Sequence, residues 1–203
     1  MKYKIKEVLI YSLFYFFLIL FSYDEKLMID YTALKSNIYL FVIFCILASQ
    51  NSTRVDNQMK VIRFSRIESS RVFSILEDSL SNVIFSVSIM AVWFAIDSLF
   101  NIRQPAISYM LNAINNVVLL TLLNAIFINL KVKFNISKLF IYVLGSIFYG
   151  ILKTGRFSLI GTTIIFMSSM SYIQYFIALA IHVALILILW VIYLKGNNSY
   201  EIQ

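Results

Sequence analysis

Six stretches without a charged side chain occupy most of this chain and leave little choice of fold class. They cover residues 8–23, 36–53, 79–96, 104–130, 139–152 and 157–194. A helix needs roughly 20 apolar residues to cross a hydrocarbon layer about 30 Å thick. Lipid offers no hydrogen-bond partner to an open backbone, so such stretches cross membranes as helices. The sequence therefore predicts an all-α polytopic membrane protein, with residues 1–203 forming one transmembrane domain.

The composition excludes several classes of protein. Apolar residues make up 61% and charged residues 13%, where soluble domains carry about 25% charged residues. No G-x-x-x-x-G-K-[ST], H-E-x-x-H or G-x-S-x-G motif occurs, so the chain is not expected to hydrolyse ATP or act as an enzyme by itself. No catalytic set, metal site, cofactor or nucleic-acid partner is predicted, and the net charge of +7 is read as a topology signal.

The last uncharged stretch is 38 residues long, too long for one helix. Its first part contains Gly161 and a run of serines, which interrupt and polarise it. We interpret residues 157–173 as a re-entrant segment and residues 175–194 as the sixth transmembrane helix. Two full spans over residues 157–194 are the alternative.

The distribution of Lys and Arg predicts the orientation in the membrane. With six spans and the N-terminus inside, the cytoplasmic side collects twelve of the 17 basic residues. Basic loops face the cytoplasm, so both termini of this multi-pass cell-membrane protein are predicted to be cytoplasmic.

The segment 54–78 combines basic residues with a helix-start signal. Ser65 and Glu68 form a capping-box pattern, in which both side chains satisfy free backbone amides. One face of the helix that follows is apolar, comprising Val72, Phe73, Leu76 and Leu80. The opposite face holds Ser70, Ser74, Glu77 and Asp78. The pattern indicates an amphipathic helix on the cytoplasmic surface that leads into the third span. Either lipid headgroups or a cytoplasmic protein would hold it.

Polar residues inside the apolar stretches form a second candidate site. Ser108, Asn112, Asn115 and Asn116 share one side of the expected fourth helix, and Asn124 lies further round. Buried amides in a membrane need partners. These residues either line a translocation path or subunit interface, or join helices by hydrogen bonds. For the single His182 we predict a neutral, hydrogen-bonded packing role, and Cys45 is the only cysteine.

The layout resembles the short permease subunits of type-2 ABC exporters. These have six helices, cytoplasmic termini, a coupling helix between the second and third spans and a re-entrant hairpin before the sixth. The stretch from Val61 to Arg66 is similar to a basic stretch in permeases of bacteriocin-immunity, antimicrobial-peptide and phenol-soluble-modulin exporters. The resemblance implies coupling to an ATPase through Arg63, Ser65, Arg66, Glu68, Arg71, Phe73 and Leu76.

The resemblance also implies the partners. A separate cytoplasmic ABC ATPase dimer would supply ATP hydrolysis, and a second permease subunit would complete the path in the lipid bilayer. The cargo would be an amphipathic or antimicrobial peptide. Two alternatives stay open at this point: a substrate-binding membrane subunit of an energy-coupling-factor importer, and an intramembrane enzyme.

Overall fold

The computed structural model describes residues 10, 13–14, 43, 45–49, 67–99, 106–134, 136–153 and 172–195, and these are helical apart from the short 136–137 connection. Four helices carry the architecture. They are α4 (Ile67–Leu99), α5 (Ala106–Phe134), α6 (Lys138–Lys153) and α8 (Tyr172–Lys195). Residues 67–99 contain neither Gly nor Pro, so nothing in the sequence interrupts the 33-residue α4.

Three of these helices are long and apolar enough to cross a membrane, over Arg71–Leu99, Tyr109–Lys131 and Tyr175–Lys195. The prediction of an all-helical protein is confirmed for the described residues, and the three helices suggest a multi-pass membrane protein. The helix α6 falls on the expected fifth stretch and, at 16 residues, is the shortest of the four helices. The expected first span and re-entrant segment lie almost wholly outside the described residues.

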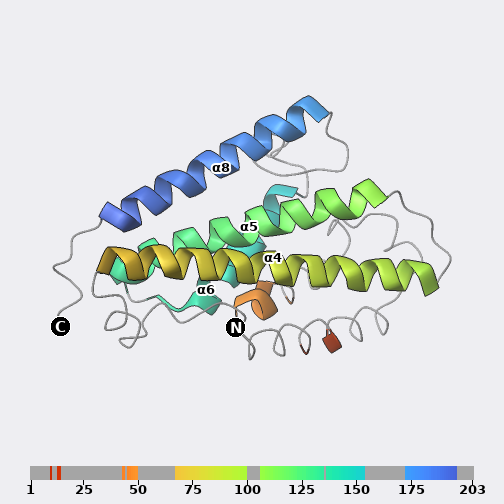
Figure 1. The fold of residues 1–203 in the computed structure, drawn as a ribbon, viewed down its shortest axis with the longest axis horizontal. Helices are drawn as coiled ribbons and strands as arrows, with labels where there is room; N and C mark the ends of the chain where they lie inside the picture. The colour runs from red at the N-terminus through yellow and green to blue at the C-terminus, as the bar shows by residue number, and fades with distance from the viewer. Residues whose placement is uncertain are drawn as a thin grey trace.

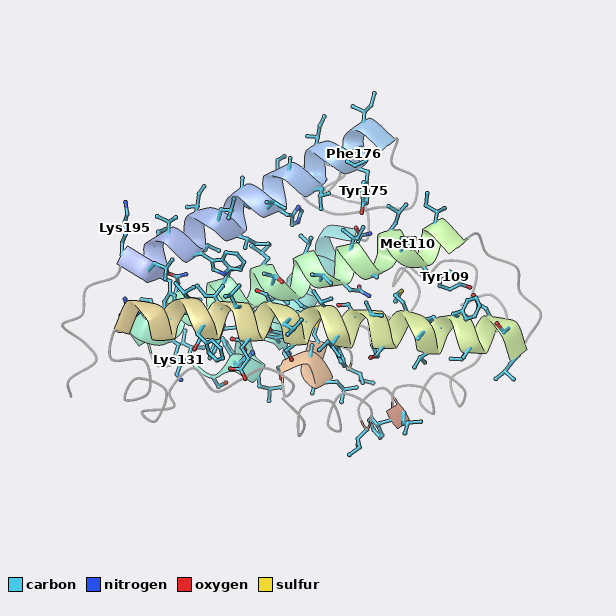
Figure 2. All side chains as sticks on the ribbon, in the orientation of Figure 1. Tyr109, Met110, Lys131, Tyr175, Phe176 and Lys195 are labelled. Atoms are coloured by element: carbon cyan, nitrogen blue, oxygen red, sulfur yellow. The ribbon has the colours of Figure 1, made fainter. Side chains whose placement is uncertain are left out.

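The long helices lie side by side (Figure 1). The helix α5 runs antiparallel to α4, and α8 runs in the same direction as α5. The start of α4, the end of α5 and the end of α8 therefore gather at one end of the bundle. Figure 2 places Lys131 and Lys195 at this end, which we call the basic end, and Tyr109 near the opposite, far end.

The outward side of α4 is apolar and its inward side is polar. Val72, Phe73, Leu76 and Leu80 lie on the exposed face, as their spacing predicts. Ser74 and Asp78 are buried on the opposite face. The amphipathic segment continues without a break into the apolar stretch after Asp78. This arrangement suits a helix in lipid, because polar groups avoid the hydrocarbon by facing other helices.

Apolar side chains fill the space between the helices in three clusters. The largest joins Cys45 and Ala48 to Phe85 and Ile89 of α4 and to α5. A second lies toward the basic end around Phe127, and a third between α5 and α8 around Ala178. A Cβ added to Gly145 of α6 would overlap Leu123 of α5, so the absence of a side chain at Gly145 permits this close approach.

Candidate functional site

A stripe of four polar residues runs along the buried face of α4. Ser74, Asp78, Asn82 and Ser86 follow one another at every fourth residue, and each is at most 3% exposed. Residues four apart lie on the same face of a helix, one above the other. We call these four residues, together with Thr121 and Asn124 of α5, the polar seam.

Two hydrogen bonds cross the polar seam between α4 and α5. The amide nitrogen of Asn124 donates to Oδ2 of Asp78 at 3.1 Å, and Nδ2 of Asn82 donates to Oγ1 of Thr121 at 3.4 Å. Two buried acceptors nearby, Oδ1 of Asn124 and Oγ of Ser86, have no hydrogen-bond partner in the described part of the chain. The polar seam therefore joins the helices with part of its hydrogen-bonding capacity unused.

The third side of this region is formed by α6. Tyr142 is fully buried, and its hydroxyl donates to the backbone oxygen of Leu120 at 3.3 Å. Nζ of Lys138 lies 5.2 Å from the Tyr142 ring centre and 5.7 Å from that of Phe127. An ammonium and two aromatic rings thus lie close together near the basic end.

At the basic end Arg71 connects α4 to the last turn of α8. Its Nη1 donates to the backbone oxygens of Tyr193 at 3.3 Å and Leu194 at 3.4 Å. The guanidinium carbon lies 5.3 Å from the centre of the Tyr193 ring. The final carbonyls of a helix lack intrahelical partners and attract cations, which explains why Arg71 turns inward.

This placement separates Arg71 from the other residues predicted to contact an ATPase. Phe73 and Leu76 are exposed at the basic end, whereas Arg71 is buried against α8. Glu68 lies in the first turn of α4, and its side chain is outside the described part of the structure. Arg63, Ser65 and Arg66 precede the described α4 and also lie outside it.

At the far end of the bundle, a second acid is bonded across α4 and α5. The Tyr109 hydroxyl donates to Oδ2 of the buried Asp97, and the rings of Phe94 and Tyr109 meet edge to face at 5.6 Å. The described partner is the phenol of Tyr109.

Among the residues predicted to line a path, Asn115 has a described partner, and that partner is on α8. Asn115 accepts a hydrogen bond of 2.9 Å from the hydroxyl of Tyr175, which points from α8 toward α5 (Figure 2). Asn116 is half-buried, and Ser108 and Asn112 belong to α5 with side chains outside the description. Asn115 therefore serves the contact between α5 and α8.

Other polar groups of α5 and α8 bond mainly to backbone. Nδ2 of Asn129 donates to the oxygens of Ala125 at 2.9 Å and Leu189 at 3.0 Å. Nδ1 of the buried His182 lies 2.7 Å from the oxygen of Ala178, so this nitrogen carries the proton of that hydrogen bond. The geometry agrees with the packing role predicted for His182.

Sequence reasoning missed Asp78, Asn82 and Ser86 as a buried set. The sequence pattern places Asp78 on a water-facing helix and Asn82 and Ser86 in the third span. The expected boundary between these two elements therefore divides the stripe. The regular spacing of four residues from Ser74 to Ser86 is the signal that would have found it. Among the described residues no group of three or more His, Cys, Asp or Glu side chains is placed to hold a metal ion.

Comparison with known proteins gives no further assignment. No family model, no curated protein and no solved structure matches this chain.

Proposed function

We propose that this chain is the transmembrane permease subunit of an ATP-driven exporter, and that its basic end faces the cytoplasm. A separate ABC ATPase dimer would supply the ATP hydrolysis, and a second permease subunit would complete the path. The cargo class is amphipathic or antimicrobial peptides, which move out of a bacterial cell or its membrane. The class of exporter comes from the sequence resemblance, and the geometry of the bundle supports the orientation.

One observation carries this proposal: basic side chains from four helix ends gather at one end of the bundle. Arg71, Lys131, Lys138 and Lys195 come from α4, α5, α6 and α8 respectively. Arg71 bonds to the end of α8, and Lys131 and Lys138 both lie within 6 Å of the Phe127 ring centre. Positive charge at one membrane face favours its cytoplasmic placement.

The helix directions support a six-span layout with a re-entrant segment. The helix α6 begins at the basic end and runs back along α5, with Lys138 near Phe127 and Gly145 against Leu123. The helix α8 then begins at the far end and returns to the basic end. From the end of α6 to the end of α8, the chain thus makes one net crossing. Two full spans over residues 157–194 would instead reverse the direction of α8.

The contact with an ATPase would lie where the chain enters α4. The basic segment before α4 leads directly to the basic end, and Phe73 and Leu76 are exposed there. A few buried aromatic or aliphatic side chains carry most of the binding energy in protein interfaces. Phe73 is the proposed anchor, with the residues from Arg63 to Arg66 beside it. In the observed arrangement, the inward-facing Arg71 joins α4 to the last turn of α8.

The test is purification of the tagged full-length chain in mild detergent from its native membranes. We expect a second protein to co-purify that carries a phosphate-binding loop and hydrolyses ATP. Phe73→Asp should remove this partner, whereas Leu99→Asp should not. Leu99 is an exposed apolar residue at the other end of the same helix, which makes it a matched control.

Two results would contradict the proposal. Robust ATP hydrolysis by the purified chain alone would show that the activity is not in a partner. An ATPase that is retained equally by wild type, by Phe73→Asp and by Arg63→Glu with Arg66→Glu would place the contact elsewhere. A reporter fused after Gln203 tests the orientation independently, because it should report the cytoplasmic side.

A further inference from the structure

We propose that α4 and α5 have two stable registers, one helical turn apart, and that the polar seam is built to exchange partners between them. The polar residues of α4 repeat at every fourth position from Ser74 to Ser86. A movement of α4 by about one turn, combined with a rotation of about 40° about its axis, therefore replaces each polar side chain by the next one. A stripe with irregular spacing would leave polar groups facing apolar ones after such a movement.

In the observed register the hydrogen bonding is incomplete. Asp78 faces Asn124 and Asn82 faces Thr121, while Oδ1 of Asn124 and Oγ of Ser86 lack a hydrogen-bond partner in the described residues. An acceptor that is buried without a hydrogen-bond partner destabilises the folded state, because it has lost its bonds to water. Asn124 is itself a member of the pair with Asp78, and Ser86 follows Asn82 four residues later on the buried side of α4.

The second register satisfies both acceptors. If α4 moves one turn toward the basic end, Asn82 comes to lie opposite Asn124, and Ser86 opposite Thr121. The Asn82 amide then donates to Oδ1 of Asn124, and the hydroxyl of Ser86 bonds to that of Thr121. Asp78 leaves Asn124 and moves one turn closer to Lys131, an ammonium near the basic end.

The exchange is discrete because side chains interlock between packed helices. Helices that slide past each other do so by whole turns, about 5.4 Å, since intermediate positions leave ridges opposite ridges. Here the polar pairs add a second reason, because at half a turn every pair of the polar seam is broken. The two registers are thus separate states that a ligand or partner can favour.

The use of this movement in export rests on the proposed function, but the two registers do not. In a permease, an ATPase bound at the basic end would pull α4 by its first turn. The register change itself can be measured on the full-length chain in lipid nanodiscs, without an ATPase or cargo. A failure of the proposed function would therefore leave the measurement unaffected.

The experiment measures distances between spin labels on exposed positions that leave the polar seam intact. One label replaces Leu99 at the far end of α4, and the other replaces Phe134 at the end of α5, in a Cys45→Ala background. Movement of α4 toward the basic end shortens this distance by about 5.4 Å. Labels at Met110 and Ile192 report the distance between α5 and α8, which should stay constant.

Asp78→Leu is the variant that should favour the second register, because it removes the Asp78 pair and leaves the Asn82–Asn124 and Ser86–Thr121 pairs possible. We expect the shorter distance to become dominant. Adding Ser86→Ala should restore the longer distance, since Ser86 gains a partner only after the shift. Ser88→Ala is the control, because Ser88 bonds to its own helix at the oxygen of Ile84.

The proposal is overturned if Asp78→Leu retains the wild-type distance, or if the shorter distance persists when Ser86→Ala is added. Should Asp78→Leu fail to insert, a cross-link between Ser86→Cys and Thr121→Cys tests the same shift with Asp78 in place. A disulfide needs Cβ atoms about 4 Å apart, which only the second register provides. No cross-link, or one formed equally by Ser88→Cys with Thr121→Cys, also overturns it.

Discussion

The two sides of α5 make contacts of different chemistry. Toward α4, polar side chains bond to polar side chains, as in the Asn124–Asp78 and Asn82–Thr121 pairs. Toward α8, Asn129 donates to a backbone oxygen, one side-chain pair joins Tyr175 to Asn115 near the far end, and apolar residues pack around Ala178. A backbone acceptor is present whatever the sequence, whereas a side-chain pair depends on both residues. The α4–α5 contact is therefore the more sensitive to substitution and the easier to rearrange.

The largest effect should come from a charge placed in the polar seam. Asn124→Asp removes the amide donor and sets a second carboxyl against Asp78 in a buried site. We expect a loss of ~3–5 kcal/mol in unfolding free energy, the scale for an uncompensated buried charge. Thermal unfolding in detergent at neutral pH measures it.

Asn115→Asp is the matched control on the same helix. Asn115 only accepts a hydrogen bond from Tyr175 in the described contact, and a carboxylate can also accept it. If Asn115→Asp destabilised the protein as much as Asn124→Asp does, the difference between the two sides of α5 would not hold.

Arg71→Ala should have the next largest effect. It removes the donor to the last carbonyls of α8 and the contact with the Tyr193 ring. Hydrogen bonds from charged groups contribute about 1.5–3 kcal/mol, so we expect a loss of ~2–3 kcal/mol. Lys195→Ala, at an exposed cation of the same end, should change the melting temperature little. Equal melting temperatures for the two variants would show that Arg71 does not hold α4 to α8.

Neighbouring residues of α8 sharpen the comparison between its two faces. Ile186 is buried against α5, whereas Leu187 is 52% exposed. Lipid is as apolar as a protein interior, so packing rather than transfer from water determines the cost. Ile186→Ala should lose ~2 kcal/mol by leaving a cavity, and Leu187→Ala should be nearly neutral. If unfolding curves in detergent showed a larger loss for Leu187→Ala than for Ile186→Ala, α8 would present Leu187 rather than Ile186 to α5.

The smallest effect is expected from Tyr175→Phe. It deletes one hydroxyl that donates to Asn115 at the far end and keeps the ring in place. Hydrogen bonds between membrane helices contribute ~0.6 kcal/mol on average, so a shift of this size in unfolding free energy is expected. A loss above 2 kcal/mol would instead make this contact as important as the polar seam.

The helices themselves could be predicted well from the sequence. The stretches 104–130 and 139–152 and the segment 175–194 each became a helix with ends within a few residues of α5, α6 and α8. An uncharged stretch of this length has few alternatives to a helix in lipid, because its backbone groups must bond to each other. The apolar face of Val72, Phe73, Leu76 and Leu80 also followed from spacing alone.

The inward direction of the polar face could not be predicted in the same way. Charged and polar residues from Arg71 to Asp78 look like a water-facing surface when the neighbours are unknown. Their burial depends on Asn124 and on the end of α8, which are about 45 and 120 residues away in the sequence. Periodicity shows which residues share a face, but only partners distant in the sequence decide where that face points.

The unequal lengths of the helices have a consequence for the surrounding bilayer. At 1.5 Å per residue, the 33 residues of α4 extend about 50 Å and the 16 residues of α6 about 24 Å. A hydrocarbon layer of about 30 Å is too thin for the first and too thick for the second. The long helix must tilt or project from the membrane, while lipid next to α6 must thin to match it. The protein thus presents a different hydrophobic thickness on each flank, and the acyl-chain length of its host membrane acts directly on the angle between these helices.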